Sequence, residues 1–159
     1  LRDFCGVEAN FVQGDVRDLP LPDDSFDIAS SEWAFQMVEN LEVALSEAHR
    51  VLRADGVLVL STPHPLYQII DTDTETIERG YFDTSPREIT IDEDYDSKLT
   101  VFERTVGDLY NAVVEAGFEV RRLIEHRSQD VEDSEPLESD LPEILWKVPE
   151  SVRFWAVAQ

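Results

Sequence analysis

A helix-like segment followed closely by an apolar strand-like segment is the feature that most constrains how this chain can fold. Apolar residues recur every three or four positions between Leu41 and Leu52, which predicts a helix with one buried face, and Asn40 stands at the N-cap position. Asp55-Gly56 ends the helix, and residues 57–60 are all apolar. Strands without polar alternation are typical of parallel sheets that are covered on both faces.

A helix-like segment followed by a strand-like segment occurs again later in the chain. Thr105, with Asp108 three residues on, resembles a capping box and predicts a second helix that ends at Gly117. Residues 118–124 and 152–158 favour two further strands, and two shorter apolar runs precede the first helix, at residues 9–14 and 26–31. Strands that alternate with helices predict an α/β sheet in a single domain.

The charge of the chain points to its environment more than to its partner. Acidic residues outnumber basic ones 35 to 13, for a net charge of −22. Such a charge repels itself at ordinary ionic strength, and molar salt screens it, so the composition is typical of halophile proteins; the alternative is an ordinary acidic protein. It argues against binding to nucleic acid or to an anionic membrane. The single cysteine, Cys5, allows no internal disulfide and favours the cytoplasm.

Three blocks in succession resemble class I S-adenosylmethionine-dependent methyltransferases, most closely the ubiquinone/menaquinone-biosynthesis branch. They are residues 11–27, residues 50–60 and residues 104–120. The first block carries Gly14-Asp15, Leu19-Pro20 and Phe26-Asp27 at the spacing of that family. The resemblance implies a Rossmann-like, doubly wound, mostly parallel sheet with strand order 3-2-1-4-5-7-6 and an antiparallel last strand. Ligands of such sheets bind beyond the carboxyl ends of the strands.

The resemblance also implies S-adenosylmethionine as the cofactor and three residues that bind it. Asp15 would accept a hydrogen bond from the adenine amino group, and the Val16 backbone N–H would face the adenine ring. Ser31 would lie along the methionine part of the cofactor. The alternative for Asp15 is that its side chain only caps a turn.

Half of the family's cofactor site has no counterpart in this sequence. The family holds the methionine end on a Gly-rich turn after its first strand and the ribose on an acid after its second strand. The chain has six glycines and no G-x-G pair. We therefore expect either a longer protein whose first two strands precede residue 1 or another segment that fills their place. We also expect residues 9–14 to lack a pairing neighbour, and these 159 residues alone to fold poorly and to transfer no methyl group.

His64 is the candidate catalytic residue, because relatives often have a similar His-Pro pair after the fifth strand. It would act as a base or contact the substrate, and the alternative is a structural or merely exposed histidine. Residues 64–100 are expected to form a lid-like insertion within the domain, with Tyr67, Tyr81 and Phe82 as part of the lid. His49 and His126 are interpreted as structural.

The segment after residue 31 is expected to face the reaction centre. Trp33 and Phe35 could line the substrate pocket or belong to the core. Many relatives carry a histidine where this chain has Gln36 or Met37, so a histidine-assisted mechanism is not expected there.

No metal site is expected. Asp71-x-Asp73-x-Glu75 lacks the glycine and the last glutamate of a calcium loop, and Asp92-x-Asp94-x-Asp96 has Ser97 in place of the glycine. The predicted function is S-adenosylmethionine-dependent methyl transfer to a small-molecule acceptor. The alternatives are a non-catalytic adaptor with the same fold and a nucleotide-dependent dehydrogenase, whose Gly-rich turn would lie in the region that we expect to be absent.

Overall fold

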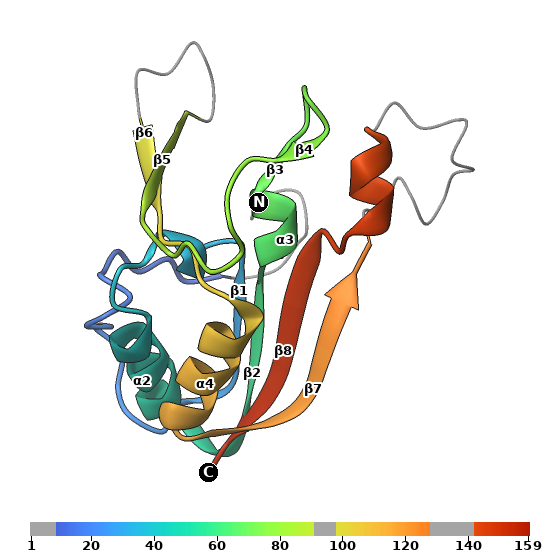
Figure 1. Cartoon of the computed structure of the whole chain (residues 1–159). Helices are drawn as coiled ribbons and strands as arrows, with labels where there is room; N and C mark the ends of the chain where they lie inside the picture. The colour runs from blue at the N-terminus through green and yellow to red at the C-terminus, as the bar shows by residue number, and fades with distance from the viewer. Residues whose placement is uncertain (1–8, 91–97, 128–141) are drawn as a thin grey trace.

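A four-stranded mixed sheet forms the centre of the computed structural model, which describes residues 9–90, 98–127 and 142–159. The strand order is β1 (Phe26–Glu32), β2 (Leu52–Pro63), β8 (Ser151–Ala158) and β7 (Phe118–His126) (Figure 1). β1 and β2 are parallel, and β8 runs antiparallel between β2 and β7. This arrangement confirms the predicted α/β class, and it is the 4-5-7-6 part of the strand order that the family resemblance implies.

Both long helices form on the predicted apolar stripes, but the predicted end of the first is wrong: α2 stops at Val51, and residues 52–56, including Asp55-Gly56, already belong to β2. α2 (Leu41–Val51) buries its apolar stripe, and Asn40 occupies its N-cap position without a capping side-chain bond. α4 (Val106–Glu115) begins with a complete capping box, in which Thr105 and Asp108 each accept a hydrogen bond from the other's backbone N–H. It ends before Gly117, whose φ of 96° lies in the left-handed region that favours glycine.

The main core lies between α2, α4 and one face of the sheet (Figure 1). β8 shows the alternation of faces most clearly, because Phe154 is fully buried and its neighbour Trp155 is 47% exposed. Residues on alternate positions of a strand point to opposite faces. Ile28 of β1, 65% exposed, is also at a position that faces away from the helices.

Residues 9–14, predicted as a strand, form no strand. Phe11 and Val12 expose 76% and 58% of their surface. A strand needs a neighbour to pair its backbone N–H and C=O groups, and within the described ranges residues 10–14 belong to no strand pair. This agrees with the expectation that the segment lacks a neighbour.

The predicted lid-like insertion contains more regular structure than its composition indicated. It begins with α3 (Pro65–Gln68), and two short antiparallel hairpins follow, β3 (Ile70–Asp71) with β4 (Thr76–Ile77) and β5 (Arg87–Thr90) with β6 (Lys98–Val101). Two 3₁₀ helices complete the described chain, η1 (Phe35–Met37) and η2 (Glu143–Lys147). No helix in the described ranges is long and apolar enough to cross a membrane.

Of the two acidic motifs considered for calcium, the structure describes only the first, at residues 71–75. Asp71 accepts hydrogen bonds from the backbone N–H groups of Asp73 and Thr74, so it closes the turn between β3 and β4. Residues 92, 94 and 96 lie outside the described ranges. Within those ranges, no group of three His, Cys, Asp or Glu side chains is placed to hold a metal ion.

The neighbouring aromatic residues of β8 provide a test of the core. Phe154→Ala removes a fully buried ring and is expected to lower the free energy of unfolding by about 3–5 kcal/mol. The matched control Trp155→Ala removes a ring from the opposite, half-exposed face and should cost clearly less. Urea unfolding followed by circular dichroism measures both, and equal losses would contradict this assignment of the faces.

Candidate functional site

The parallel pairing of β1 with β2 brings two chain segments together at one edge of the sheet. The register runs from Ile28 opposite Val57 to Glu32 opposite Ser61, so both strands end at the same edge. The chain leaves β1 through Trp33 and η1, and it leaves β2 through Pro63 and α3. This is the edge at which open α/β sheets bind ligands.

A mainly apolar cavity of about 320 Å³ lies at this edge. Its wall comes from the ends of β1 and β2 and from the hairpins of the predicted lid-like insertion. The lining residues are Trp33, Gln36, Pro63, Tyr67, Gln68, Ile70, Arg87, Ile89 and Val101. An apolar cavity with a few polar groups is the usual form of a small-molecule site.

The turn after β1 is strained. Trp33 has a φ of 51°, in a region that bulky side chains rarely adopt. Its peptide is held on both sides, because its N–H donates to the Ser61 carbonyl at 2.9 Å and its carbonyl accepts from the Gln36 amide nitrogen at 2.7 Å. Such strain is often found at functional sites. Trp33 lines the cavity, whereas Phe35 is buried in the core, so the two aromatic residues have different roles.

An ion pair that the sequence reasoning missed closes another side of the cavity. Arg87 of β5 lies 3.2 Å from Glu103, whose side chain is almost fully buried. Burial raises the pKa of Glu103, and Arg87 opposes this effect. In the orientation that satisfies both groups, the Gln68 amide nitrogen also donates to Glu103. Arg87 and Glu103 are 16 residues apart in the sequence, and the β5–β6 hairpin brings them together.

His64 is held by hydrogen bonds on both ring nitrogens. Nδ1 accepts from the Leu66 N–H at 3.0 Å, so Nε2 carries the proton and donates to Glu125 at 2.8 Å. The residue is 2% exposed, and burial lowers its pKa although Glu125 opposes the shift. His64 therefore connects the end of β2 to β7, and it is not among the residues that line the apolar cavity. Its assignment as base or substrate contact stays a prediction.

The other histidines have contacts of a structural kind. His49 of α2 lies edge-on to the ring of Phe118, with 5.1 Å between the ring centroids. His126 ends β7, and its carbonyl accepts a hydrogen bond from the Glu150 N–H. Tyr81 from the lid-like insertion accepts from the Val106 N–H at the start of α4, which joins this insertion to the helix.

Asp15 lies in an exposed turn where its carboxylate binds Arg17. It accepts from the Arg17 backbone N–H at 2.9 Å and from the Arg17 guanidinium at 2.7 Å, and these bonds lower the pKa of Asp15 to about 2. The carboxylate is therefore ionised and able to accept at neutral pH. Val16, the next residue, packs against the core with its side chain. Ser31 is half-buried near the end of β1.

The loop after Asp15 is attached to α2 by Arg50. Its guanidinium donates to the carbonyls of Leu19 and Leu21, and it forms ion pairs with Asp23 and Glu47. The Leu19 N–H in turn donates to Glu47 at 2.8 Å. Side chains of α2 thus supply hydrogen-bond partners for backbone groups of this loop.

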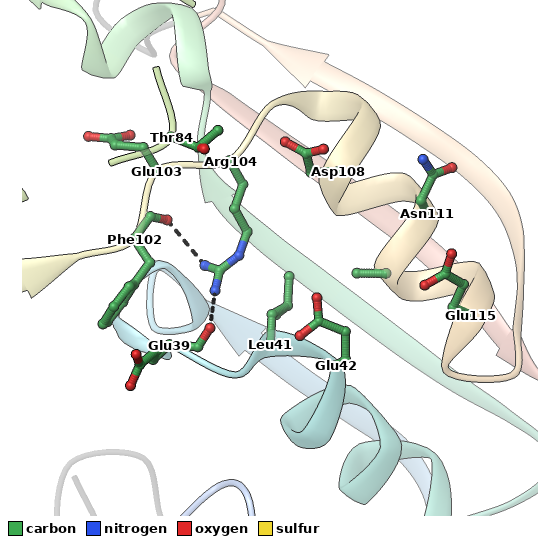
Figure 2. Close-up of a pocket in the computed structure, with 11 residues that line it drawn as sticks. Glu39, Leu41, Glu42, Thr84, Phe102, Glu103, Arg104, Asp108, Asn111 and Glu115 are labelled. Atoms are coloured by element: carbon green, nitrogen blue, oxygen red, sulfur yellow. Dashed lines mark hydrogen bonds between the residues drawn. The ribbon is translucent and has the colours of Figure 1, made fainter. Parts of the chain in front are cut away.

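A second hollow, of about 510 Å³, lies between α2 and α4 and contains the Arg104 side chain (Figure 2). The guanidinium donates to the carbonyls of Phe102, Val38 and Glu39, and burial lowers the pKa of Arg104. Figure 2 shows acidic side chains from both helices around this hollow. Arg104 ties the segment after η1 to the start of α4, and so fixes the position of η1 beside the apolar cavity.

Comparisons with known proteins agree with the sheet order and with the sequence blocks. A family described as a methyltransferase domain matches residues 2–60. The malonyl-[acyl-carrier protein] O-methyltransferase of Yersinia pestis is 43% identical over 56 residues, which are 35% of this chain and 21% of that protein. The ubiquinone/menaquinone biosynthesis C-methyltransferase of Rhizobium meliloti is 42% identical over 57 residues, 35% of this chain and 22% of that protein. The chain thus matches about a fifth of the length of these relatives.

A solved structure extends the similarity to the whole fold. An S-adenosylmethionine-dependent methyltransferase structure from Listeria monocytogenes aligns with a TM-score of 0.71 and 18% identity, over 93% of this chain and 68% of that chain. The chain has the class I methyltransferase fold. Within this methyltransferase fold, the apolar cavity lies at the carboxyl edge of β1 and β2, and the Asp15 turn precedes β1.

Arg50 should control the order of the loop that carries the Asp15 turn. Arg50→Lys keeps the charge but cannot reproduce the fork of donors that holds Glu47 and the Leu19 carbonyl. The Leu19 amide, which donates to Glu47, should therefore exchange with deuterium faster. The amides of Asp24 and Ser25 serve as internal controls, because they donate to backbone carbonyls of Arg50 and Val51. Equal acceleration of all three amides would contradict a specific role of the side chain.

His64 should make stability depend on pH. The pKa of His64 in the folded chain is below its unfolded value of about 6.5, so at mildly acidic pH the unfolded chain binds a proton at His64 more readily than the folded chain does. Stability is therefore complete above about pH 6.5 and falls as the pH decreases below it, by at most about 1.4 kcal/mol per pH unit. Urea unfolding at pH 5.5 and 7.5 tests this, and His64→Gln should show a smaller difference. The same difference in both proteins would refute it.

Proposed function

We propose that this protein transfers a methyl group from S-adenosylmethionine to a small-molecule acceptor that binds in the apolar cavity beside β1 and β2. The observation that carries this proposal is the position of the cavity, at the carboxyl ends of two parallel strands in a class I methyltransferase fold. The activities of the relatives support the same reaction class, because both are named as methyltransferases.

The chemistry of the turn before β1 fits the adenine end of the proposed cofactor. Asp15 supplies an ionised acceptor for an amino group, and the Val16 backbone N–H is a donor of the kind that a ring nitrogen accepts. Arg17 already donates four hydrogen bonds to the Asp15 carboxylate, so an amino group has to displace part of this exposed guanidinium. Ser31 is proposed to lie beside the methionine part.

The proposed cofactor supplies an activated methyl group on a positively charged sulfur. The protein therefore has to align the acceptor with this methyl group, exclude water and take up the proton that the acceptor loses. Trp33 and the apolar residues of the cavity would exclude water from the acceptor. His64 is proposed as the base or as a substrate contact. To act as a base it would need its Nε2 proton moved onto Glu125, because its Nδ1 is occupied by the Leu66 N–H.

The insertion between residues 64 and 100 is proposed to act as the lid of the acceptor cavity. Five of its described residues support this, because they line the cavity: Tyr67, Gln68, Ile70, Arg87 and Ile89. The domain would thus be a single methyltransferase domain in which the hairpins select the acceptor.

We propose the cytoplasm of a salt-adapted cell as the place of action, and neither nucleic acid nor a membrane as a partner. The single cysteine and the net charge of −22 support these assignments.

Removal of the Asp15 carboxylate tests the cofactor site. In calorimetric titration of the purified protein with S-adenosylmethionine, Asp15→Ala should weaken binding on the order of tenfold, as expected for a hydrogen bond to a charged group. Asp15→Asn keeps an acceptor and should weaken binding less. Arg17→Ala, which frees the carboxylate from its competitor, should not weaken it. Unchanged affinity in Asp15→Ala would remove the adenine contact from this proposal.

A further inference from the structure

We propose that Arg87 binds the methyl acceptor in the apolar cavity, and that this acceptor is a carboxylic acid with an apolar body, bound as its carboxylate. The inference rests on the proposed function and names the substrate class for the same cavity. A carboxylate oxygen is then the atom that receives the methyl group.

The alternation of the β5–β6 hairpin places the Arg87 side chain on the face that is turned to the cavity. Arg87 and Ile89 are alternate residues of β5, and Arg87 is directly opposite Val101 of β6. Alternate residues of a strand, and residues opposite each other on paired strands, lie on the same face. All three residues line the cavity. The other face of the hairpin carries Glu88 and Lys98, which form an exposed ion pair at 2.9 Å.

The Arg87 guanidinium has donors beyond those that Glu103 uses. Glu103 Oε1 lies 3.2 Å from both Nε and Nη2 of Arg87. A guanidinium has five N–H donors in one rigid plane, and its Nη1 group takes part in neither of these contacts. The Arg87 side chain is 32% exposed, whereas that of Glu103 is 7% exposed. The accessible member of this ion pair is therefore the cation.

The lining of the cavity is suited to a negative charge. Arg87 is positively charged, and the amides of Gln36 and Gln68 are neutral. Burial raises the pKa of Tyr67, so its hydroxyl stays protonated at neutral pH. The described residues of the lining thus include a positive charge and no negative one. A carboxylate matches the fork of a guanidinium, and the remaining lining is apolar, so an acid with an apolar body fits both parts.

A carboxylate acceptor also agrees with the way His64 is bound. Carboxylic acids have a pKa of about 4, so the acceptor is ionised at neutral pH and has no proton to lose. Its oxygen forms the new bond to the methyl carbon as the bond from that carbon to sulfur breaks, and the electron pair of the broken bond stays on sulfur. His64 can then keep its hydrogen bonds with the Leu66 N–H and with Glu125 during the reaction.

The competing explanation is that the Arg87–Glu103 pair only holds the hairpin in place. Burial raises the pKa of Glu103, while the charges of Arg87 and Arg79 oppose this effect. Glu103 is therefore the carboxylate that competes with a ligand for Arg87. If Arg87 binds the acceptor, Glu103→Gln should strengthen the binding of an acid, because the cation loses its competing partner. If the pair is only structural, this substitution leaves ligand binding unchanged.

The test compares octanoate with octanamide, which has the same chain and a neutral amide in place of the carboxylate. Dissociation constants are measured by ligand-observed NMR at pH 7.5 on the purified protein and on three variants. Glu103→Gln removes the competitor, and Arg87→Met combined with Glu103→Gln removes the cation without leaving a buried carboxylate unpaired. The control Lys98→Met removes a cation from the opposite face of the same hairpin. One ionic strength is used throughout, because the net charge of −22 repels anions from every variant.

The expected preference for octanoate is roughly tenfold in the unchanged protein and in Lys98→Met, as for hydrogen bonds to a charged group. It should be larger in Glu103→Gln and absent in the double variant. Thermal unfolding of each variant establishes that it is folded before binding is compared.

Three results would overturn the inference: octanoate that binds no more tightly than octanamide to the unchanged protein, the same octanoate preference in the double variant, or methyl transfer to 1-octanol but not to octanoate. The binding result is independent of the cofactor titration. Loss of S-adenosylmethionine binding on its own would defeat the proposed function, whereas an octanoate preference that does not depend on Arg87 would defeat only the assigned acceptor class.

Discussion

The parallel pairing of β1 with β2 is the constraint on which the rest of the structure depends. It sets Glu32 beside Ser61 and thereby brings two loops, otherwise 30 residues apart, to one edge of the sheet. The helix between these strands, α2, then has to cover the face that they share, and its apolar stripe does so. β8 fits antiparallel against the other side of β2, and its buried Phe154 completes the main core beneath α4. The candidate site follows from this packing, because the cavity forms where these strands end.

Three charged side chains give the irregular segments around the site defined positions. Arg50 holds the loop before β1, Arg104 holds the segment after η1, and Arg87 connects the β5–β6 hairpin to Glu103. Two of these arginines bind mainly or partly to backbone carbonyls, which loops leave without a partner more often than helices and strands do. In a chain with 13 basic residues against 35 acidic ones, these cations are engaged in positioning the backbone of the site.

The elements governed by local patterns could be predicted from the sequence. Each of these patterns lies within about a dozen residues of sequence: the apolar stripe of α2, the Thr105–Asp108 capping box of α4 and the apolar run of β2. The surroundings of His64 could not be predicted, because its partner Glu125 is 61 residues away and belongs to another strand. The same holds for the burial of Glu103, whose partner Arg87 comes from the β5–β6 hairpin. Residues 10–14 show the opposite case, in which β-favouring residues form no strand in the described structure.

The left-handed backbone at Trp33 has a consequence for the variation of this protein. At position 33, the conformational demand and the shape of the cavity act on the same residue. Glycine and asparagine adopt that backbone at low cost, and both are far smaller than tryptophan. Glycine or asparagine at position 33 would therefore relax the main chain and widen the cavity. β-Branched residues there would be disfavoured by the main-chain conformation. A wider cavity and a less strained turn would thus result from a single substitution at this position.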